Sequence, residues 1–445
     1  MRILRSIKTN WARTCSCKVS QVRCPKDEEE IIALVKEANK HGKRLKVVGG
    51  GDSYNDIFCP EEGGILLSLK AMDRVLEVDK RLNRVTFEAG IMMPDLIRYL
   101  KKEGLSLSNL GTNIFDNLAG ACSTGYHGSG INYSIFSSFV TAFEIITPTG
   151  EKRRIEKGDD AFAIYAVGLG VLGIITKITL QCEPYFKLEV IEKKMPFEQI
   201  EAEFEQLLAK NDHFKFIWVP HTKDFMVWLG NRTDKPRSSG FKKFMTYFTT
   251  GLLINNLFHE FLLFFASFRR SLVPRINRLM SRILLPKYSE SVYDAHWAFF
   301  LPHLLKQDVV EYAFDIKDTF KVFKEVIAMI EEKGIYVDTP VEVRFVKGDN
   351  YWMSPSYGMD SCWIGTKIHF PYYRRPEYQR YFTEIDTILL RYRGRPHWGK
   401  QFRITTEDFK RAYPKWDAFW NYVDQEDPNR ILQYGFIRRL RGREA

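Results

Sequence analysis

The hydrophobic and polar positions of the first 180 residues alternate between helical and strand spacing. Asp27 and three glutamates precede an apolar set at helical spacing that ends before Gly42, which predicts an N-capped amphipathic helix. A second helix is predicted over 94–102 and a short one over 160–167. Strands are predicted over 45–48, 65–69, 75–78, 85–89, 139–147 and 174–180. This order of elements predicts two α/β lobes.

The pattern changes after Pro184, where charged helical spacing, as in 197–208, replaces the glycine-rich rhythm of the earlier segment. We therefore place a domain boundary near residue 185. A chain of 445 residues is long for a single core, so two or three domains with a cleft between them are expected.

A short alternating pattern in the C-terminal half places two opposite charges on one strand face. Val341, Val343 and Phe345 share one face of the predicted strand, and Glu342 and Arg344 share the other. Such a pair can orient a polyol or lactone, and the guanidinium can stabilise a developing oxyanion. An ordinary ion pair on a strand gives the same pattern, so the residues alone leave both interpretations open.

Between Lys243 and Arg269 the chain is rich in Phe and Leu and almost uncharged. Its length would allow a membrane span, but Thr, Asn, His and Glu residues are spread through it. We expect one or two interfacial helices flanked by the basic residues Lys242, Lys243, Arg269 and Arg270. A buried core helix is the alternative.

The composition is that of a globular protein, with 45% hydrophobic and 27% charged residues. The 66 Lys and Arg exceed the 55 Asp and Glu, but they are scattered and no nucleic-acid-binding signature accompanies them. We expect a solvated basic surface and no nucleic-acid partner. The N-terminus lacks the apolar run of a secretory signal.

The seven cysteines are odd in number and irregularly spaced, which favours reduced thiols in a cytosol-facing compartment. Only Cys15, Cys17 and Cys24 are close together in the sequence. No fourth ligand follows them at a familiar spacing, so no metal site is expected.

Three flexible loops follow one another in the N-terminal segment. A predicted buried strand runs into Gly49-Gly50-Gly51-Asp52-Ser53, where backbone amides can converge on a bound anion. Taken alone, this loop favours a plain tight turn, and it is neither a Walker A motif nor a GxGxxG fingerprint. The stretches 108–112 and 120–130 repeat the mixture of glycine and hydroxyl side chains. Together the three loops predict a site for an extended polar ligand.

The order of VVGGGDS, SNLG, GACSTGYHGSG and GLGVLGIITKITLQC resembles the FAD domain of the vanillyl-alcohol-oxidase superfamily. In the C-terminal half, VEVRF followed by KGD, then PHWGK, and the earlier WVPHT resemble the aldonolactone oxidases of that superfamily. The resemblance covers about residues 20–436.

The resemblance implies an α+β fold with a two-lobed FAD-binding domain over 15–185. A substrate or cap domain would occupy 186–445, with a C-terminal segment that returns to the flavin. The implied catalytic residues are Glu342, Arg344 and Lys400, the last at the pyrimidine edge of the flavin. The implied FAD contacts are Val48, Gly49, Gly50, Gly51, Asp52, Ser53, Ser108, Asn109, Gly111, Ser123, Thr124, Gly125, His127, Gly128, Gly173, Ile174 and Ile175.

Two positions refine what the resemblance implies. Asp52 stands where the covalent members carry the histidine that tethers the flavin, so non-covalent FAD is expected. Gly111 stands where a small residue leaves room for dioxygen, which favours an oxidase. His127 is interpreted as a structural histidine.

The implied reaction is FAD-dependent oxidation of an aldono-1,4-lactone at carbon 2, with dioxygen as acceptor and hydrogen peroxide as co-product. The alternatives are a dehydrogenase that reduces a cytochrome or quinone, and a non-catalytic membrane-attached flavoprotein. We expect peripheral attachment to a membrane of endoplasmic-reticulum type in a eukaryote, or otherwise a cytoplasmic location.

Overall fold

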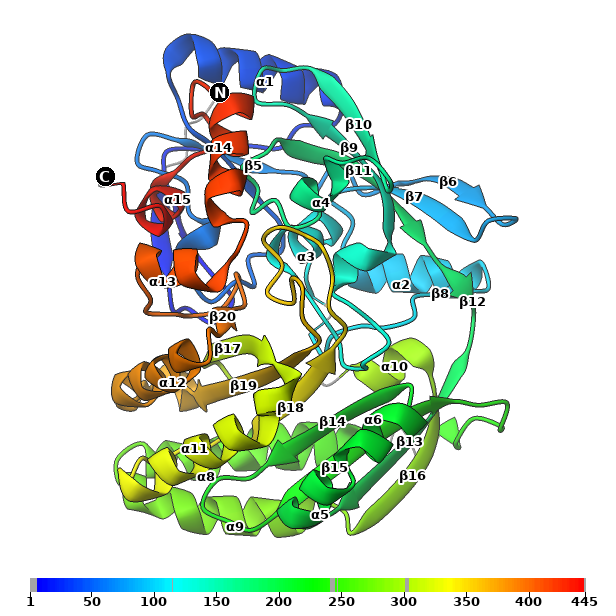
Figure 1. The fold of residues 1–445 in the computed structure, drawn as a ribbon, viewed down its shortest axis with the longest axis vertical. Coiled ribbons are helices and arrows are strands. Elements are labelled where there is room, and N and C mark those ends of the chain that lie inside the picture. The colour runs from blue at the N-terminus through cyan, green and yellow to red at the C-terminus, as the bar shows by residue number, and fades with distance from the viewer. Residues whose placement is uncertain (1–5, 114, 241–244, 246, 301–303, 444–445) are drawn as a thin grey trace.

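A computed structural model describes residues 6–113, 115–240, 245, 247–300 and 304–443 of the chain. Its elements form an upper and a lower part in Figure 1. The upper part combines the N-terminal segment, drawn in blue and cyan, with the C-terminal helices, drawn in red. The segment between them forms the lower part in green, yellow and orange. The two ends of the chain therefore build one lobe.

The upper part contains a small parallel sheet in the order β3 (Gln21–Arg23), β5 (Ile65–Ser68) and β4 (Leu45–Val48). Helix α1 (Glu28–His41) packs beside it and confirms the first predicted helix. The Asp27 carboxylate accepts the N–H of Glu30, and Gly42 ends the helix at φ 59°.

A second, antiparallel sheet completes the upper part. Its strand order is β10 (Lys152–Glu156), β9 (Val140–Ile146), β11 (Ile174–Gln181), β7 (Arg84–Glu88) and β6 (Val75–Asp79). The strands predicted from the apolar runs are all present, within one or two residues of their expected ends. Its neighbours are α2 (Met93–Lys102), α3 (Leu118–Thr124), α4 (Phe162–Tyr165), β8 (Leu105–Ser106) and β12 (Glu183–Pro184).

The lower part is organised around an eight-stranded sheet that begins at Lys187. Its order is β16 (Tyr288–Asp294), β13 (Lys187–Lys194), β15 (Phe225–Arg232), β14 (His213–Trp218), β18 (Val341–Val346), β19 (Ser361–His369), β17 (Gln307–Asp315) and β20 (Arg395–Pro396).

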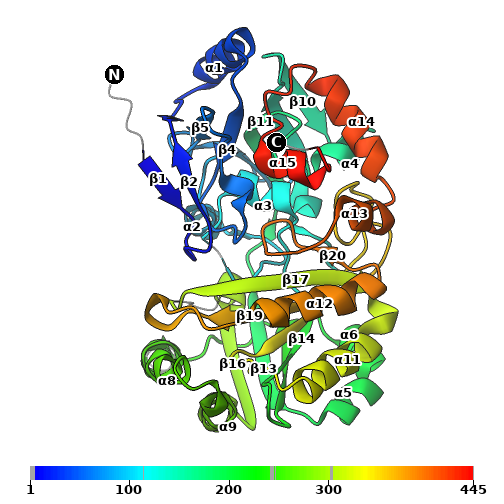
Figure 2. The ribbon, with the colours of Figure 1, turned by 90° about the vertical axis from the view of Figure 1, so that its left-hand side faces the viewer.

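Helices cover one face of this sheet (Figure 2). They are α5 (Phe197–Ala202), α6 (Phe204–Lys210), α11 (Thr319–Glu332) and α12 (Gln379–Arg391). Val341, Val343 and Phe345 of β18 are fully buried against them in one hydrophobic cluster. The helical pattern at 197–208 thus forms two helices, separated at Glu203, instead of one.

The C-terminal segment returns to the upper lobe as α13 (Thr406–Ala412), α14 (Trp416–Glu426) and α15 (Gly435–Leu440). The Leu45 N–H donates to the Ile431 carbonyl at 2.7 Å, and Lys46 Nζ donates to the Tyr434 hydroxyl at 2.7 Å. Many apolar side chains of this segment belong to the core cluster of the upper lobe.

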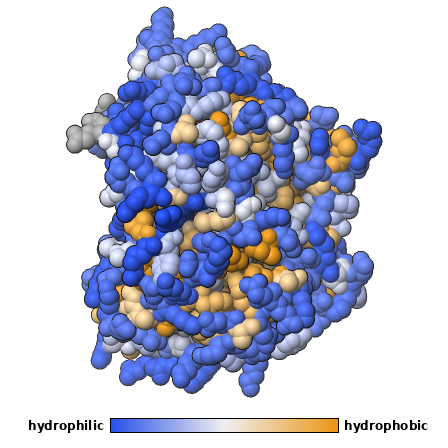
Figure 3. All heavy atoms as spheres, viewed as in Figure 1, coloured by the Kyte–Doolittle hydropathy of each residue, from blue (hydrophilic) through white to orange (hydrophobic). Residues whose placement is uncertain are grey.

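An N-terminal hairpin that the sequence pattern did not predict lies at the edge of the upper lobe (Figure 2). Its strands are β1 (Ser6–Thr9) and β2 (Ser16–Val19), and within the described part of the chain they pair only with each other. Figure 3 shows a mainly hydrophilic upper lobe, with apolar patches gathering at and below the waist of the molecule.

The apolar segment of the sequence forms a π-helix (Tyr247–Phe258) and α8 (His259–Ala266). The helices α9 (Val273–Leu284) and α10 (Ala295–Phe299) follow it. Leu263, Ala266 and Val273 are buried in a small cluster of their own. Among the described residues, no helix combines the length and the apolar character that crossing a membrane requires. Lys242 and Lys243, predicted to flank the segment, lie outside the described residues.

Candidate functional site

Strand register brings five polar or small positions together on one face of the eight-stranded sheet, opposite the face that the helices cover. Arg344 lies opposite Lys215 on one neighbouring strand, while Glu342 lies opposite Gly365 on the other. Gly365 in turn lies opposite Glu311 of β17. Residues directly opposite one another share a sheet face, so these side chains point away from the covering helices. They form the floor of a site between the two lobes.

Glu342 and Arg344 contact each other and also face the site. The Arg344 Nη2 donates to Glu342 Oε2 at 2.6 Å and to the Thr112 hydroxyl at 3.0 Å, while Lys215 Nζ donates to Glu342 Oε1 at 2.8 Å. Burial alone would raise the pKa of Glu342. The positive charges of Arg344 and Lys215 outweigh this effect and hold the pKa of Glu342 well below its usual range. Glu342 likewise raises the pKa of Arg344. The pair is therefore an ionised, fixed unit.

Two cavities meet between the lobes. The first, of about 140 Å³, is lined by all three predicted catalytic residues, Glu342, Arg344 and Lys400. The second, of about 110 Å³, is lined by the glycine loop 49–51. Asp52, Ser53, Asp116 and Thr124 line both, so the two cavities adjoin. We call them the substrate-side cavity and the glycine-loop cavity.

Lys400 reaches the substrate-side cavity from a turn that is bound to the glycine loop. The Tyr54 N–H donates to the Gly399 carbonyl at 2.7 Å, and Asn55 Nδ2 donates to the carbonyls of Trp398 and Lys400 at 2.8 and 2.6 Å. The Lys400 Nζ lies 4.6 Å from the centre of the Tyr54 ring. Residues 397–400 and 51–55, which are distant in sequence, therefore fix one another.

The three positions after β4 require glycine for different structural reasons. A Cβ at Gly49 would lie 1.9 Å from Asn117 Oδ1, and one at Gly50 would lie 2.8 Å from the Phe115 carbonyl. These two glycines thus allow close approach of the chain at 115–117. Gly51 has φ 76°, and a Cβ there would meet no atom within 4 Å, so this glycine leaves its backbone open to the cavity.

Gly111 is constrained by its own neighbours. A Cβ there would lie 2.7 Å from the His127 carbonyl and 2.8 Å from the Tyr126 ring. Packing therefore already requires a small residue at this position, and its predicted role in admitting dioxygen stays a prediction.

The cavities bring most of the predicted cofactor residues together. Those that line one or both are Val48, Gly49, Gly50, Gly51, Asp52, Ser53, Gly111, Ser123, Thr124, His127, Gly173 and Ile175. Gly128 lines only a small neighbouring pocket. The others line neither cavity: Ser108, Asn109, Gly125 and Ile174. Ile174 is a core residue, and Gly125 ends α3 at φ 74°.

Two lysines that line the cavities were missed by the sequence analysis, Lys46, which is buried, and Lys367, which is partly buried. Lys46 of β4 lines the glycine-loop cavity, and burial lowers its pKa to about 7. Lys367 of β19 lines the substrate-side cavity, and burial lowers its pKa to about 8. Among the described residues, the Lys367 ammonium has no hydrogen-bond or ion-pair partner. A lysine inside an apolar strand run was the available signal in both cases.

Asp52 and Asp116 sit where the two cavities join. Burial, and then the proximity of Asp116, raises the pKa of Asp52 to about 7. Burial also raises the pKa of Asp116 to about 6, although Lys400 opposes this shift. One oxygen of Asp52, Oδ2, is buried without a hydrogen-bond partner among the described residues. The site thus holds two carboxyl groups that titrate close to neutral pH.

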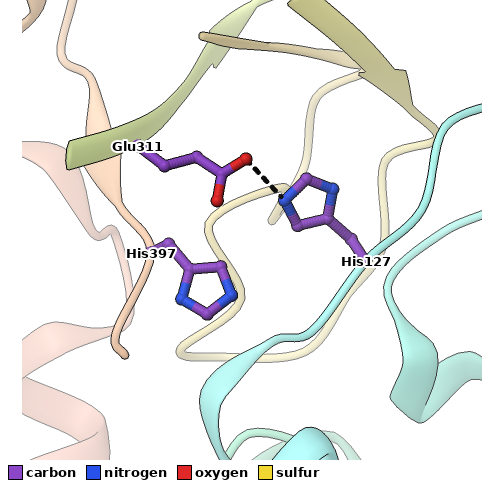
Figure 4. Close-up of side chains that lie close together, drawn as sticks. All are labelled: His127, Glu311 and His397. Atoms are coloured by element: carbon purple, nitrogen blue, oxygen red, sulfur yellow. Dashed lines mark ion pairs between the residues drawn. The ribbon is translucent and has the colours of Figure 1, made fainter. Parts of the chain in front are cut away.

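His127, Glu311 and His397 line the substrate-side cavity. Figure 4 shows the Glu311 carboxylate directed at His127. The ligand atoms of all three residues lie within 4.8 Å of one another, close enough to surround a metal ion. However, His397 Nδ1 accepts the Gly399 N–H, so its proton is on Nε2, which then has no lone pair for a metal. Burial, and then Lys400, lowers the pKa of His397 to about 3. Hydrogen bonding suits this group better than metal binding.

Comparison with known proteins identifies the chain. Residues 178–440, more than half of its length, match the family described as D-arabinono-1,4-lactone oxidase. The chain belongs to this family. Residues 19–156 match the FAD binding domain family. The predicted family and FAD as cofactor are therefore confirmed, and the protein is an FAD-linked oxidoreductase.

Members similar to this chain include both oxidases and a dehydrogenase. It is 32% identical to L-gulonolactone oxidase of Scyliorhinus torazame over 433 residues, 97% of each chain. It is 30% identical over 442 residues to L-gulono-1,4-lactone dehydrogenase of Mycobacterium tuberculosis, covering 98% of this chain and 99% of the other. The fold matches cholesterol oxidase from B. sterolicum with a TM-score of 0.80 at 17% identity, covering 99% and 97% of the two chains. That likeness confirms the predicted flavoprotein fold.

The residues of the glycine-loop cavity fit FAD. A diphosphate needs open backbone amides and a cation, and Gly51 and Lys46 supply them in a cavity otherwise lined largely by apolar and small residues. Asp52 lies where this cavity adjoins the one lined by Glu342 and Arg344.

The raised pKa of Asp52 predicts a pH-dependent effect of Asp52→Asn on the apoprotein. Because its folded pKa lies above the unfolded value, this group favours folding at low pH and loses that contribution as the pH rises to 7. The asparagine variant should therefore gain stability relative to the parent between pH 5 and 8, by on the order of 2 kcal/mol at pH 8. Melting curves of both flavin-free proteins across this range test it. A difference independent of pH would contradict it.

Proposed function

We propose that this chain oxidises an aldono-1,4-lactone at carbon 2, with FAD as its redox cofactor and dioxygen as electron acceptor. The observation that carries the proposal is the ionised Glu342–Arg344 pair on the floor of a cavity that adjoins the one lined by the glycine loop. The names of the relatives support the substrate class.

The chain's own residues bind and orient the lactone. Arg344 donates to substrate oxygens through its planar fork and stabilises the oxygen from which the hydroxyl proton leaves. Glu342, held ionised by Arg344 and Lys215, accepts from ring hydroxyls. Lys367, without a partner among the described residues, supplies further donors from the same sheet face. Bound FAD would supply the oxidant for carbon 2, and Lys400, which lines the same cavity, would place a positive charge beside it.

Gly111 supports dioxygen as the electron acceptor, because the resemblance associates a small residue at this position with access of dioxygen to the flavin. Reduction of a cytochrome or quinone is the alternative, and the dehydrogenase among the relatives favours it. A non-catalytic flavoprotein is disfavoured because Glu342, Arg344 and Lys400 all line one cavity.

Substitution of the floor pair should reduce turnover far more than it reduces stability. Arg344→Lys keeps the charge but removes the fork, and Glu342→Gln removes the charged acceptor. We expect each to lower turnover by on the order of ten- to a thousand-fold with little loss of bound FAD. Glu342→Gln should also lower the melting temperature modestly, because Lys215 and Arg344 lose their counter-charge. Anaerobic flavin bleaching and peroxide release with a panel of lactones measure both steps.

A matched control is available outside the cavities. Arg74 forms a two-point ion pair with Glu88, with bonds of 3.1 and 2.7 Å. Arg74→Lys should leave turnover at the parental level. Near-parental turnover of Arg344→Lys with every lactone would instead make the Glu342–Arg344 pair a structural salt bridge.

We also propose that FAD is held non-covalently, because Asp52 cannot form the histidyl tether. Acid precipitation should release all of the flavin into the supernatant, where its absorbance is measured. Asp52→His serves as the comparison, since it restores the side chain that tethers flavin in the covalent members. Yellow colour retained in the pellet of the parent protein would refute non-covalent binding.

We further propose peripheral attachment to a membrane through an aromatic patch. Phe261 and Phe265 on α8 and Phe268 just after it are exposed, and Phe268 is 62% exposed. The segment that contains Tyr372 and Tyr373 packs beside α8. Arg374 stacks on Phe268 at 4.0 Å. Apolar rings with tyrosines and arginines at their margin suit the boundary between headgroups and acyl chains. The patch residues are Phe258, Phe261, Phe265, Phe268, Tyr372 and Tyr373.

Vesicle sedimentation tests this attachment. The full chain should bind vesicles of phosphatidylcholine with phosphatidylserine. The triple variant Phe261→Ser, Phe265→Ser, Phe268→Ser should bind about ten-fold or more weakly, because it loses the three exposed rings that would enter the bilayer. Leu76→Ser with Leu82→Ser, at exposed positions of the upper lobe, is the control and should bind like the parent. Equal binding by parent and triple variant would exclude the patch.

A further inference from the structure

Three of the seven cysteines converge at the edge of the upper lobe, although they come from two separate segments. Cys15 directly precedes β2, Cys17 lies within it, and Cys59 follows the 3-10 helix Asp56–Phe58. The Sγ atoms of Cys15 and Cys59 lie 3.9 Å apart, and all three residues are partly exposed. Cys24, which is near Cys15 and Cys17 in sequence, is exposed beyond the end of β3. The third cysteine of the cluster is therefore Cys59, although Cys24 is closer to Cys15 and Cys17 in sequence.

The two segments are joined at the mouth of the flavin site. Asn10 Nδ2 donates to the Ser53 carbonyl at 2.9 Å, and the Thr14 hydroxyl donates to the Tyr54 carbonyl at 2.6 Å. The Trp11 N–H donates to the Gly51 carbonyl at 3.1 Å, and Trp11 itself lines the substrate-side cavity. The turn between β1 and β2 therefore covers the loop at which the two cavities meet.

The environment makes the three thiols unequal. The hydrogen bond between Cys15 and Cys59 lowers the pKa of Cys15, and the nearby Arg439 guanidinium adds to this effect. The same contact raises the pKa of Cys59, and burial raises the pKa of Cys17. A thiolate is the reactive form of cysteine, so Cys15 is the best nucleophile of the three.

We propose that Cys15 and Cys59 form an oxidation site for hydrogen peroxide, at which a disulfide closes the N-terminal hairpin onto the flavin loop. The Cys15 thiolate attacks one peroxide oxygen, the O–O bond breaks, and hydroxide leaves as the sulfenic acid forms. The Cys59 sulfur then attacks the sulfur of the Cys15 sulfenic acid, and the S–O bond breaks. The proton of the Cys59 thiol passes to the departing oxygen, which leaves as water. Two thiols lose two electrons in total, and one peroxide is reduced to two waters.

The hairpin can make the required movement. A disulfide needs the sulfur atoms about 2 Å apart, so they must approach from 3.9 Å. β1 and β2 form a sheet of two strands in the part of the chain that the structure describes, and such a hairpin adapts more easily than a core strand. A closed disulfide would link residues on both sides of α1 and the glycine loop, and would raise the melting temperature by a few degrees.

Only the source of the oxidant rests on the proposed function, because a lactone oxidase would release peroxide beside Trp11. The test adds peroxide directly and therefore does not depend on lactone turnover. The purified full-length flavoprotein is exposed to micromolar hydrogen peroxide with EDTA present, quenched with N-ethylmaleimide, and mapped by mass spectrometry without reduction. We expect a peptide pair linked through Cys15 and Cys59 to accumulate at least ten-fold faster than oxidation of the exposed Cys24, which serves as the control within each sample.

Variants then assign the roles. Cys15→Ser should slow the loss of the Cys59 thiol about ten-fold or more, and Cys24→Ser should leave it unchanged. In Cys59→Ser the sulfenic acid of Cys15 should persist and be trapped by dimedone. Oxidation of Cys15 and Cys59 no faster than that of Cys24, or a link from Cys59 to Cys17 in the parent protein, would overturn the proposal. The comparison with Cys24 needs no variant, so it holds even where a substitution impairs folding.

Discussion

Side-chain alternation along β18 is the constraint on which the rest of the structure depends. Val341, Val343 and Phe345 are fully buried against the covering helices, so the strand cannot shift by one residue without placing charges in the lower core. The same register fixes Glu342 and Arg344 on the opposite face, where Lys215, Gly365 and Glu311 of neighbouring strands meet them. The energetics of the core thereby determine the geometry of the site.

Local patterns predicted a large part of this arrangement. Periodicity located most strands of the upper lobe to within one or two residues, and it placed Glu342 and Arg344 on one face of β18. These features depend on residues that are close in sequence, where the 2- and 3.6-residue repeats carry the information. The distinction between an ion pair and a cavity-lining pair required the structure, and the structure assigns both properties to the same two residues.

Features that depend on contacts between distant segments were not predictable in this way. Lys46 and Lys367 sit in apolar strand runs, and only the assembled sheets show that their ammonium groups face cavities. The convergence of Cys59 with Cys15 depends on a hairpin whose short strands give no clear signal. Gly49 and Gly50 were interpreted as ligand-facing, yet their most direct role is to admit the chain at 115–117. Each case is a contact across tens or hundreds of residues.

The closure of the upper lobe by the last forty residues has a consequence for how the protein is made. The Leu45 N–H bonds to the Ile431 carbonyl, and Lys46 in the glycine-loop cavity bonds to Tyr434. During synthesis the N-terminal domain emerges first and can begin to fold, but these partners leave the ribosome only at the end. Its core and the cation of its cofactor cavity remain incomplete until then. Stable loading of the flavin is therefore a post-translational event that reports on completion of the entire chain.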